Sequence, residues 1–165
     1  MSINTYAFLD SRAKDNDIFE WIIGKIQFLE IECSMVDSSK TEYWIKHPDG
    51  KTIWMNIEKL SSSNVYSSHF TRLDCPPWIV SLDSSAGRRE IDLVLMYLVP
   101  WLLIQHSHGL GAVDPQLGSE LVTEETEWLR ITKRVFSGVD YDFLSVFEKS
   151  KDMIEQDISN EDPPH

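Results

Sequence analysis

The chain has 165 residues, of which 27 are Asp or Glu and 15 are Lys or Arg, so its formal net charge is −12. Six tryptophans and a hydrophobic fraction of 42% exclude a disordered acidic segment, which would be poor in aromatic residues. The length predicts one domain, and the charge disfavours nucleic acid and anionic membranes as partners while it favours a basic protein.

The N-terminal segment and the cysteines predict a cytoplasmic protein without cofactors. The N-terminus lacks the basic flank and the apolar run of a secretory signal. The longest apolar stretch, residues 91–104, is shorter than the roughly 20 residues that span a bilayer, so it predicts a buried helix. Cys33 and Cys75 are far apart and form no CxxC motif, which predicts two reduced thiols rather than a zinc site or a disulfide.

The first predicted elements are a strand over residues 5–9 and an amphipathic helix. Asp17 followed by Glu20 has the pattern of a capping box, so we expect the helix to begin there. Gly24, in the middle of this helix, predicts the close approach of a neighbouring element. The apolar face of the helix is predicted from residues at helical spacing: Ile18, Trp21, Ile22, Ile26 and Leu29.

Residues 41–58 predict a β-hairpin around Pro48-Asp49-Gly50, in which His47 pairs with Lys51 and Gly50 takes a positive φ. This register divides the side chains between two faces of the hairpin. The predicted core face consists of Tyr43, Ile45, Ile53, Met55 and Ile57. The predicted outer face consists of Glu42, Trp44, Lys46, Thr52, Trp54 and Asn56.

Trp44 and Trp54 face each other on the otherwise polar outer face of this hairpin. Such a pair has two interpretations: another element covers it, or it is exposed as an anchor for a partner. We therefore treat Trp44, Trp54 and the neighbouring Glu42 as candidate partner-binding residues.

The middle of the chain predicts a loop, a strand, a long helix and a short strand. Residues 61–68 predict the loop, interrupted by a short strand around Val65, and residues 78–82 predict the next strand. The long apolar helix is expected over residues 88–105, where Pro100 should kink or divide it. Residues 112–113 predict the last strand. This order predicts an α+β fold, with an antiparallel sheet and helices packed on one of its faces, ferredoxin-like or related.

Two C-terminal helices are predicted after this sheet, one over residues 123–137 and one that Asp140 caps. We expect residues 1–137 to form the α+β domain, an acidic helix over 138–159 to pack on it, and 160–165 to be a disordered tail. The apolar stripe of the last helix is predicted to comprise Leu144, Phe147, Lys151, Ile154 and Ile158.

Half of the excess negative charge lies after residue 137, where eight acidic residues accompany two lysines. This segment is either a solubilising surface or a surface presented to a basic partner. We therefore add Asp140, Asp142 and Asp152 to the candidate partner-binding residues.

His106, His108 and Asp114 are the candidate metal or catalytic residues. Two imidazoles and a carboxylate could hold a metal or supply a general base, which would make the protein a small metal-dependent hydrolase. The alternative is structural, because a helix C-terminus favours cationic His and because Asp before Pro115 suits a turn. No other nucleophile or metal motif is found in the sequence.

The segment over residues 108–118, HGLGAVDPQLG, resembles a segment of small cytoplasmic immunity proteins of bacterial toxin systems. The resemblance covers about eleven residues and implies a role: binding a cognate toxin so that its active site is blocked. Together with the acidity, it predicts a non-enzymatic inhibitor of a basic toxin or effector. The alternatives are an effector adaptor or chaperone with similar surface chemistry, and the metal-dependent hydrolase.

Overall fold

A computed structural model describes residues 3–26, 32–35, 41–84, 90–116, 118, 120–136 and 143–159. Within these residues, one antiparallel sheet has the strand order β2-β3-β4-β5-β1-β6. The strands are β1 (Ile3–Leu9), β2 (Glu32–Met35), β3 (Glu42–Lys46), β4 (Thr52–Lys59), β5 (Trp78–Ser84) and β6 (Gly109–Val113). The helices are α1 (Asp15–Ile26), α2 (Glu90–Ile104), α3 (Glu125–Phe136) and α4 (Phe143–Ser159), with a 3₁₀ helix η2 (Val65–Phe70).

The sheet contains the strand order of a ferredoxin-like fold. All neighbouring strands are antiparallel, so β6, β1, β5 and β4 alternate in direction as they do in that fold. Two further strands, β3 and β2, extend the sheet beyond β4, and α1 precedes β2 in the chain. The predicted α+β class, with helices on one sheet face and additional C-terminal helices, is confirmed.

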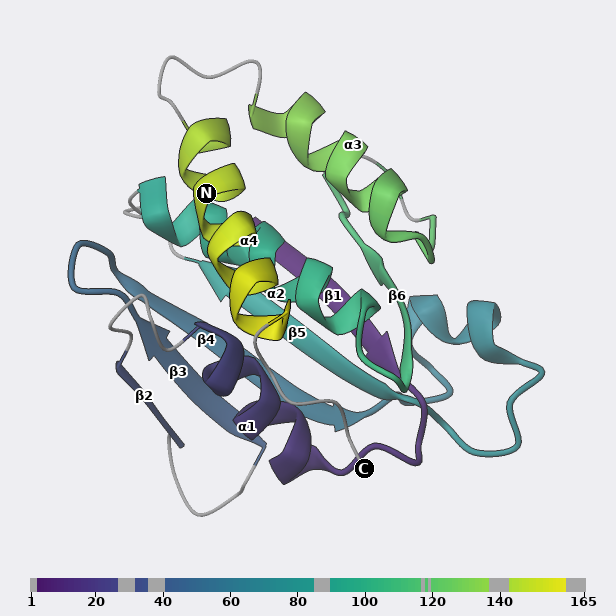
Figure 1. The fold of residues 1–165 in the computed structure, drawn as a ribbon. Coiled ribbons are helices and arrows are strands. Elements are labelled where there is room, and N and C mark those ends of the chain that lie inside the picture. The colour runs from purple at the N-terminus through teal and green to yellow at the C-terminus, as the bar shows by residue number, and fades with distance from the viewer. Residues whose placement is uncertain are drawn as a thin grey trace.

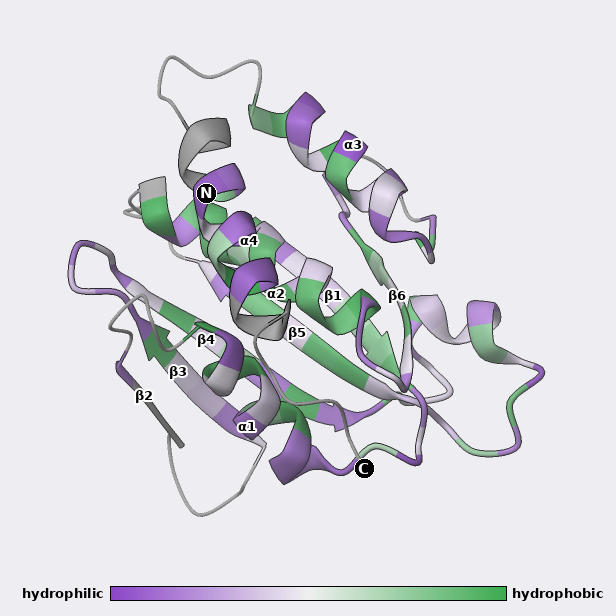
Figure 2. Cartoon of the chain, in the orientation of Figure 1, coloured by the Kyte–Doolittle hydropathy of each residue, from purple (hydrophilic) through white to green (hydrophobic). Residues whose placement is uncertain are grey.

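The α-helices form two layers on one face of the sheet (Figure 1). Helix α2 lies against β1, β5 and β6, and α3 and α4 pack on α2. Because α2 is covered on both sides, it is apolar around most of its circumference, and residues 94–99 are buried (Figure 2). Helix α4 places Phe147 and Ile154 in the same hydrophobic core as Ala7 and Leu9 of strand β1.

The opposite face of the sheet, which we call the open face, is covered at one end by η2. Phe8 and Ile79 point to this face and form a small second core with Tyr66 and Leu60. The rings of Phe8 and Tyr66 lie 5.8 Å apart in an edge-to-face arrangement. The part of the open face on β3 and β4 carries the exposed side chain of Trp54.

Two expectations for α1 are wrong. The helix begins at Asp15 rather than Asp17, because the N–H of Ile18 already donates to the carbonyl of Lys14 (2.9 Å). No neighbouring element among the described residues approaches Gly24 closely, because a Cβ atom added there would have no atom within 4 Å. The predicted buried positions Ile18 and Ile22 are confirmed, together with Ile26, while Leu29 lies outside the described residues.

In the middle of the chain, strand β2 was not predicted, and residues around Val65 form a 3₁₀ helix instead of a strand. Helix α2 runs through Pro100 without division. Pro100 has no N–H to bond the carbonyl of Met96, four residues earlier, and the buried hydroxyl of Thr5 donates to that carbonyl instead (2.8 Å). A hydrogen bond from β1 therefore compensates for the proline.

Candidate functional site

The predicted hairpin register is confirmed, and it places the two tryptophans opposite each other. Trp44 pairs with Trp54, and Ile45 pairs with Ile53. The predicted core-face residues are all buried: Tyr43, Ile45, Ile53, Met55 and Ile57. Because side chains alternate along a strand, Trp44 and Trp54 lie on the open face, away from the helices.

The hairpin loop is held by a different interaction from the one predicted. Gly50 does not have a positive φ. A Cβ at Gly50 would instead lie 2.2 Å from Asp92 Oδ1, so this position accommodates the close approach of α2. Both carboxylate oxygens of the buried Asp92 accept the N–H of Lys51, at 2.9 and 3.1 Å. Helix α2 thereby fixes the loop of the hairpin that carries the tryptophans.

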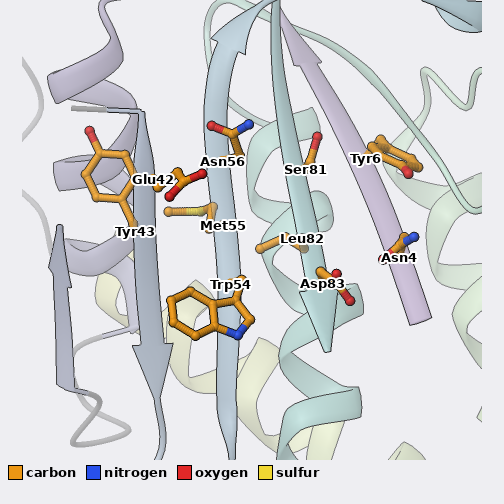
Figure 3. A pocket seen from close by; sticks show the side chains of 10 residues that line it. All are labelled: Asn4, Tyr6, Glu42, Tyr43, Trp54, Met55, Asn56, Ser81, Leu82 and Asp83. Carbon is orange, nitrogen blue, oxygen red and sulfur yellow. The ribbon is translucent and has the colours of Figure 1, made fainter. Parts of the chain in front are cut away.

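A groove of about 600 Å³ crosses the open face from β1 to β3 (Figure 3). The side chain of Trp54 is its largest exposed hydrophobic surface, with a relative exposure of 49%. We call this feature the open-face groove, and it is lined by Asn4, Tyr6, Glu42, Tyr43, Trp54, Met55, Asn56, Ser81, Leu82 and Asp83. An exposed tryptophan in a hollow of this kind is typical of binding surfaces.

The charged groups of the groove are both carboxylates. Glu42 and Asp83 bring two carboxylates, and the ten lining residues include no Lys or Arg. The Asn4 amide, oriented so that both of its ends are satisfied, donates to Asp83 Oδ1 (3.1 Å). Asn56 Oδ1 is buried and accepts no hydrogen bond from any described residue. The groove is therefore negatively charged, and one of its lining residues, Asn56, has a buried acceptor without a hydrogen bond.

The acidic C-terminal helix lies on the other side of the molecule. Asp152 of α4 is exposed and lies 3.7 Å from the ammonium of Lys151, which also contacts Glu155 (3.1 Å). Helix α4 packs on α2, which separates it from the sheet, so α4, which carries Asp152, and the open face, which carries Trp54, lie on opposite sides of the sheet (Figure 1). The predicted Asp140 and Asp142 lie outside the described residues. The hairpin surface with Trp54 and the acidic surface with Asp152 are therefore not adjacent.

The three candidate metal ligands do not come together. His106 and His108 lie just before β6, and their ring centroids are 5.7 Å apart. Asp114 follows the other end of that strand. Five residues of β6 separate His108 from Asp114, which corresponds to about 15 to 20 Å. Among the described residues, no group of three His, Cys, Asp or Glu side chains is arranged to hold a metal ion.

Asp114 and His106 have structural roles, whereas Nδ1 of His108 is buried without a hydrogen bond to any described residue. The hydroxyl of Tyr97 donates to Asp114 Oδ2 (2.7 Å) and the N–H of Gln116 donates to Oδ1 (3.0 Å), which forms the predicted turn before Pro115. Burial raises the pKa of the Asp114 carboxyl, although these two hydrogen bonds oppose the change. Burial, together with the nearby His108, lowers the pKa of His106, whose ring meets Trp21 edge-on.

Sequence analysis identified Glu42 and Trp54 of the groove, together with Trp44, which is half-buried and does not line it, but missed the other half of the groove. Asp83 and Ser81 are the polar residues of β5 on the open face, and Asn4 and Tyr6 are their partners on β1. The alternation of polar and apolar residues in β5 could have shown that one of its faces is open. The order of strands in space, which joins β5 and β1 to the hairpin, is not encoded in any local pattern.

Comparisons with protein-family models, with curated proteins and with solved structures give no match to this chain. Among the helices of the described residues, none is long and apolar enough to cross a membrane.

Proposed function

We propose that the protein is a non-enzymatic inhibitor of the immunity type, which binds a cognate basic toxin or effector through the open-face groove and so blocks the active site of that protein. The observation that carries the proposal is the half-exposed Trp54 within an acidic groove on the sheet face opposite the helices. Tryptophan side chains in such positions provide much of the binding energy of protein interfaces.

Charge supports a basic partner. The net charge of −12 and the carboxylates of Glu42 and Asp83 would attract a cationic surface over long distances. This attraction raises the association rate and depends on salt, whereas contacts of Trp54 would slow dissociation. The same charge disfavours nucleic acid and anionic membranes as partners.

The structure also supports a rigid binding surface. The groove is formed by neighbouring strands, and the Asp92 carboxylate fixes the loop of the hairpin. A surface that is ordered before binding loses less conformational entropy on association. We propose that the protein acts in the cytoplasm, where an exposed free thiol such as Cys75 persists in reduced form.

The test uses matched baits on a lysate of the native host. Wild-type protein, Trp54→Ala and Asp152→Asn are immobilised, and the captured proteins are compared. The proposal predicts a basic protein that wild type and Asp152→Asn retain and Trp54→Ala loses.

Co-expression then separates inhibition from delivery. The gene of the captured protein is expressed with and without this chain, and growth is measured. An inhibitor restores growth in the presence of the active toxin, whereas an adaptor or chaperone changes only its delivery. Capture that is independent of Trp54, or a captured protein without toxicity, would contradict the proposal.

A further inference from the structure

The acceptors in the open-face groove define which partner group it can bind. Asn56 Oδ1 is buried without a hydrogen bond from the described residues, and the carboxylate of Glu42 lies on the neighbouring strand. A buried acceptor without a donor is costly, and a donor from a bound partner would remove this cost. A bound group that supplies an N–H or O–H therefore fits this acceptor better than a group without a donor.

Two acceptors of the groove, the carboxylate of Glu42 and Oδ1 of Asn56, lie close to Trp54. Glu42 and Asn56 are direct partners across β3 and β4, so their Cβ atoms are separated by about 5 Å. Trp54 lies two residues from Asn56 on the same face of β4, about 7 Å along the strand. Figure 3 shows the three side chains on adjacent strands of the groove.

We infer that the open-face groove receives an arginine side chain of the protein partner, whose guanidinium stacks on Trp54 and donates hydrogen bonds to Glu42 and Asn56. This inference rests on the proposed function, because it names the chemical group that the partner supplies. A guanidinium is planar and stacks on aromatic rings, and its five N–H donors reach two acceptors at once. It also carries the positive charge that the carboxylates favour.

Other cationic groups fit these observations less well. A lysine ammonium is a compact charge that binds its water strongly, and it cannot stack as a plane on Trp54. A quaternary ammonium has no N–H, so it would leave Asn56 Oδ1 without a donor. Asp83, to which the Asn4 amide donates, adds negative charge at the other side of Trp54.

The test is a titration of the full chain with short capped peptides, followed by NMR of the backbone and of the indole N–H groups. Four probes have the same sequence, glycine on each side of one variable residue, which is arginine, lysine, citrulline or trimethyl-lysine. Citrulline has the shape of arginine without its charge. We expect the arginine peptide to bind at least about fivefold more tightly than the other three and to shift the indole N–H of Trp54.

Two isosteric variants locate the site. Glu42→Gln removes a lining carboxylate, and Glu58→Gln removes a carboxylate of β4 that is also exposed on the open face but lies outside the groove. We expect Glu42→Gln to weaken the arginine peptide about tenfold and Glu58→Gln less than twofold. Folding of both variants is checked by the same spectra.

Several results would overturn the inference. The first is that the citrulline or lysine peptide binds as tightly as the arginine peptide. The second is that Glu42→Gln and Glu58→Gln weaken the arginine peptide equally. The third is that the indole N–H signal of Trp54 does not shift. If these occur while the captured partner still depends on Trp54, the arginine site fails and the proposed function stands. If the arginine peptide behaves as expected but no toxic partner is found, the arginine site stands and the inhibitor role fails.

Discussion

Replacing Gly50 by alanine should destabilise the protein, and the structure defines why. Gly50 does not have a positive φ, so its backbone accepts alanine, and the smaller entropy of the unfolded chain would by itself stabilise by about 0.4 to 1 kcal/mol. Against this, the new Cβ would lie 2.2 Å from Asp92 Oδ1 and 3.0 Å from Ile91 Cγ2. The buried carboxylate must therefore move away from the N–H of Lys51.

A hydrogen bond to a charged group contributes about 1.5 to 3 kcal/mol, which exceeds the entropic gain. The expected net loss is about 0.5 to 2.5 kcal/mol in the free energy of unfolding, measured by urea denaturation. Gly24→Ala is the matched control, because the added Cβ would have no atom of the described residues within 4 Å, and it should stabilise by about 1 kcal/mol. A Gly50→Ala protein as stable as wild type would refute the proposed contact between the hairpin and α2.

Four other substitutions test the core, the groove and the turn at Asp114. Thr5→Val should cost about 1 to 3 kcal/mol of unfolding free energy in urea, because it leaves the Met96 carbonyl opposite Pro100 without a donor; an unchanged midpoint would contradict this. Trp128→Ala, at a fully buried ring, should cost about 3 to 5 kcal/mol, whereas Trp54→Ala, at a half-exposed ring, should cost much less; similar losses would place Trp54 in the core. Burial raises the pKa of Asp114 in the folded state, so its ionisation should reduce wild-type stability as pH rises above about 3.8. The stability of Asp114→Asn relative to wild type should therefore increase over that range, and a decrease would show that the hydrogen bonds from Tyr97 and Gln116 outweigh burial.

The hairpin and its two faces could be predicted because its signals are local. Pro48-Asp49-Gly50 sets the loop, and alternation then assigns each side chain to a face. The role of Gly50 could not be predicted, because it depends on Asp92, some 40 residues later, which approaches only when α2 packs on the sheet. Strand β2 was missed because it has four residues and no β-branched side chain.

The candidate site was half predicted for a similar reason. The alternatives for Trp54, covered or exposed, depend on whether another element packs on the open face, and η2 covers only the end around Phe8. Pairing of Trp54 with Asp83 and of Asn56 with Ser81 brings β5 into the groove, and this follows from strand order. The charge of α4 could be read from the sequence, but its position behind α2 could not.

The central claim, that the open face binds the partner, is tested most directly by the affinity of the captured partner for Trp54→Ala and for Asp152→Asn. The two positions lie on opposite sides of the molecule and are both exposed. We expect Trp54→Ala to weaken binding about 30-fold, as expected for the loss of about 2 kcal/mol at an interface hot spot, and Asp152→Asn to change it less than twofold. Binding that Asp152→Asn weakens and Trp54→Ala leaves unchanged would place the interface on α4 and contradict the claim.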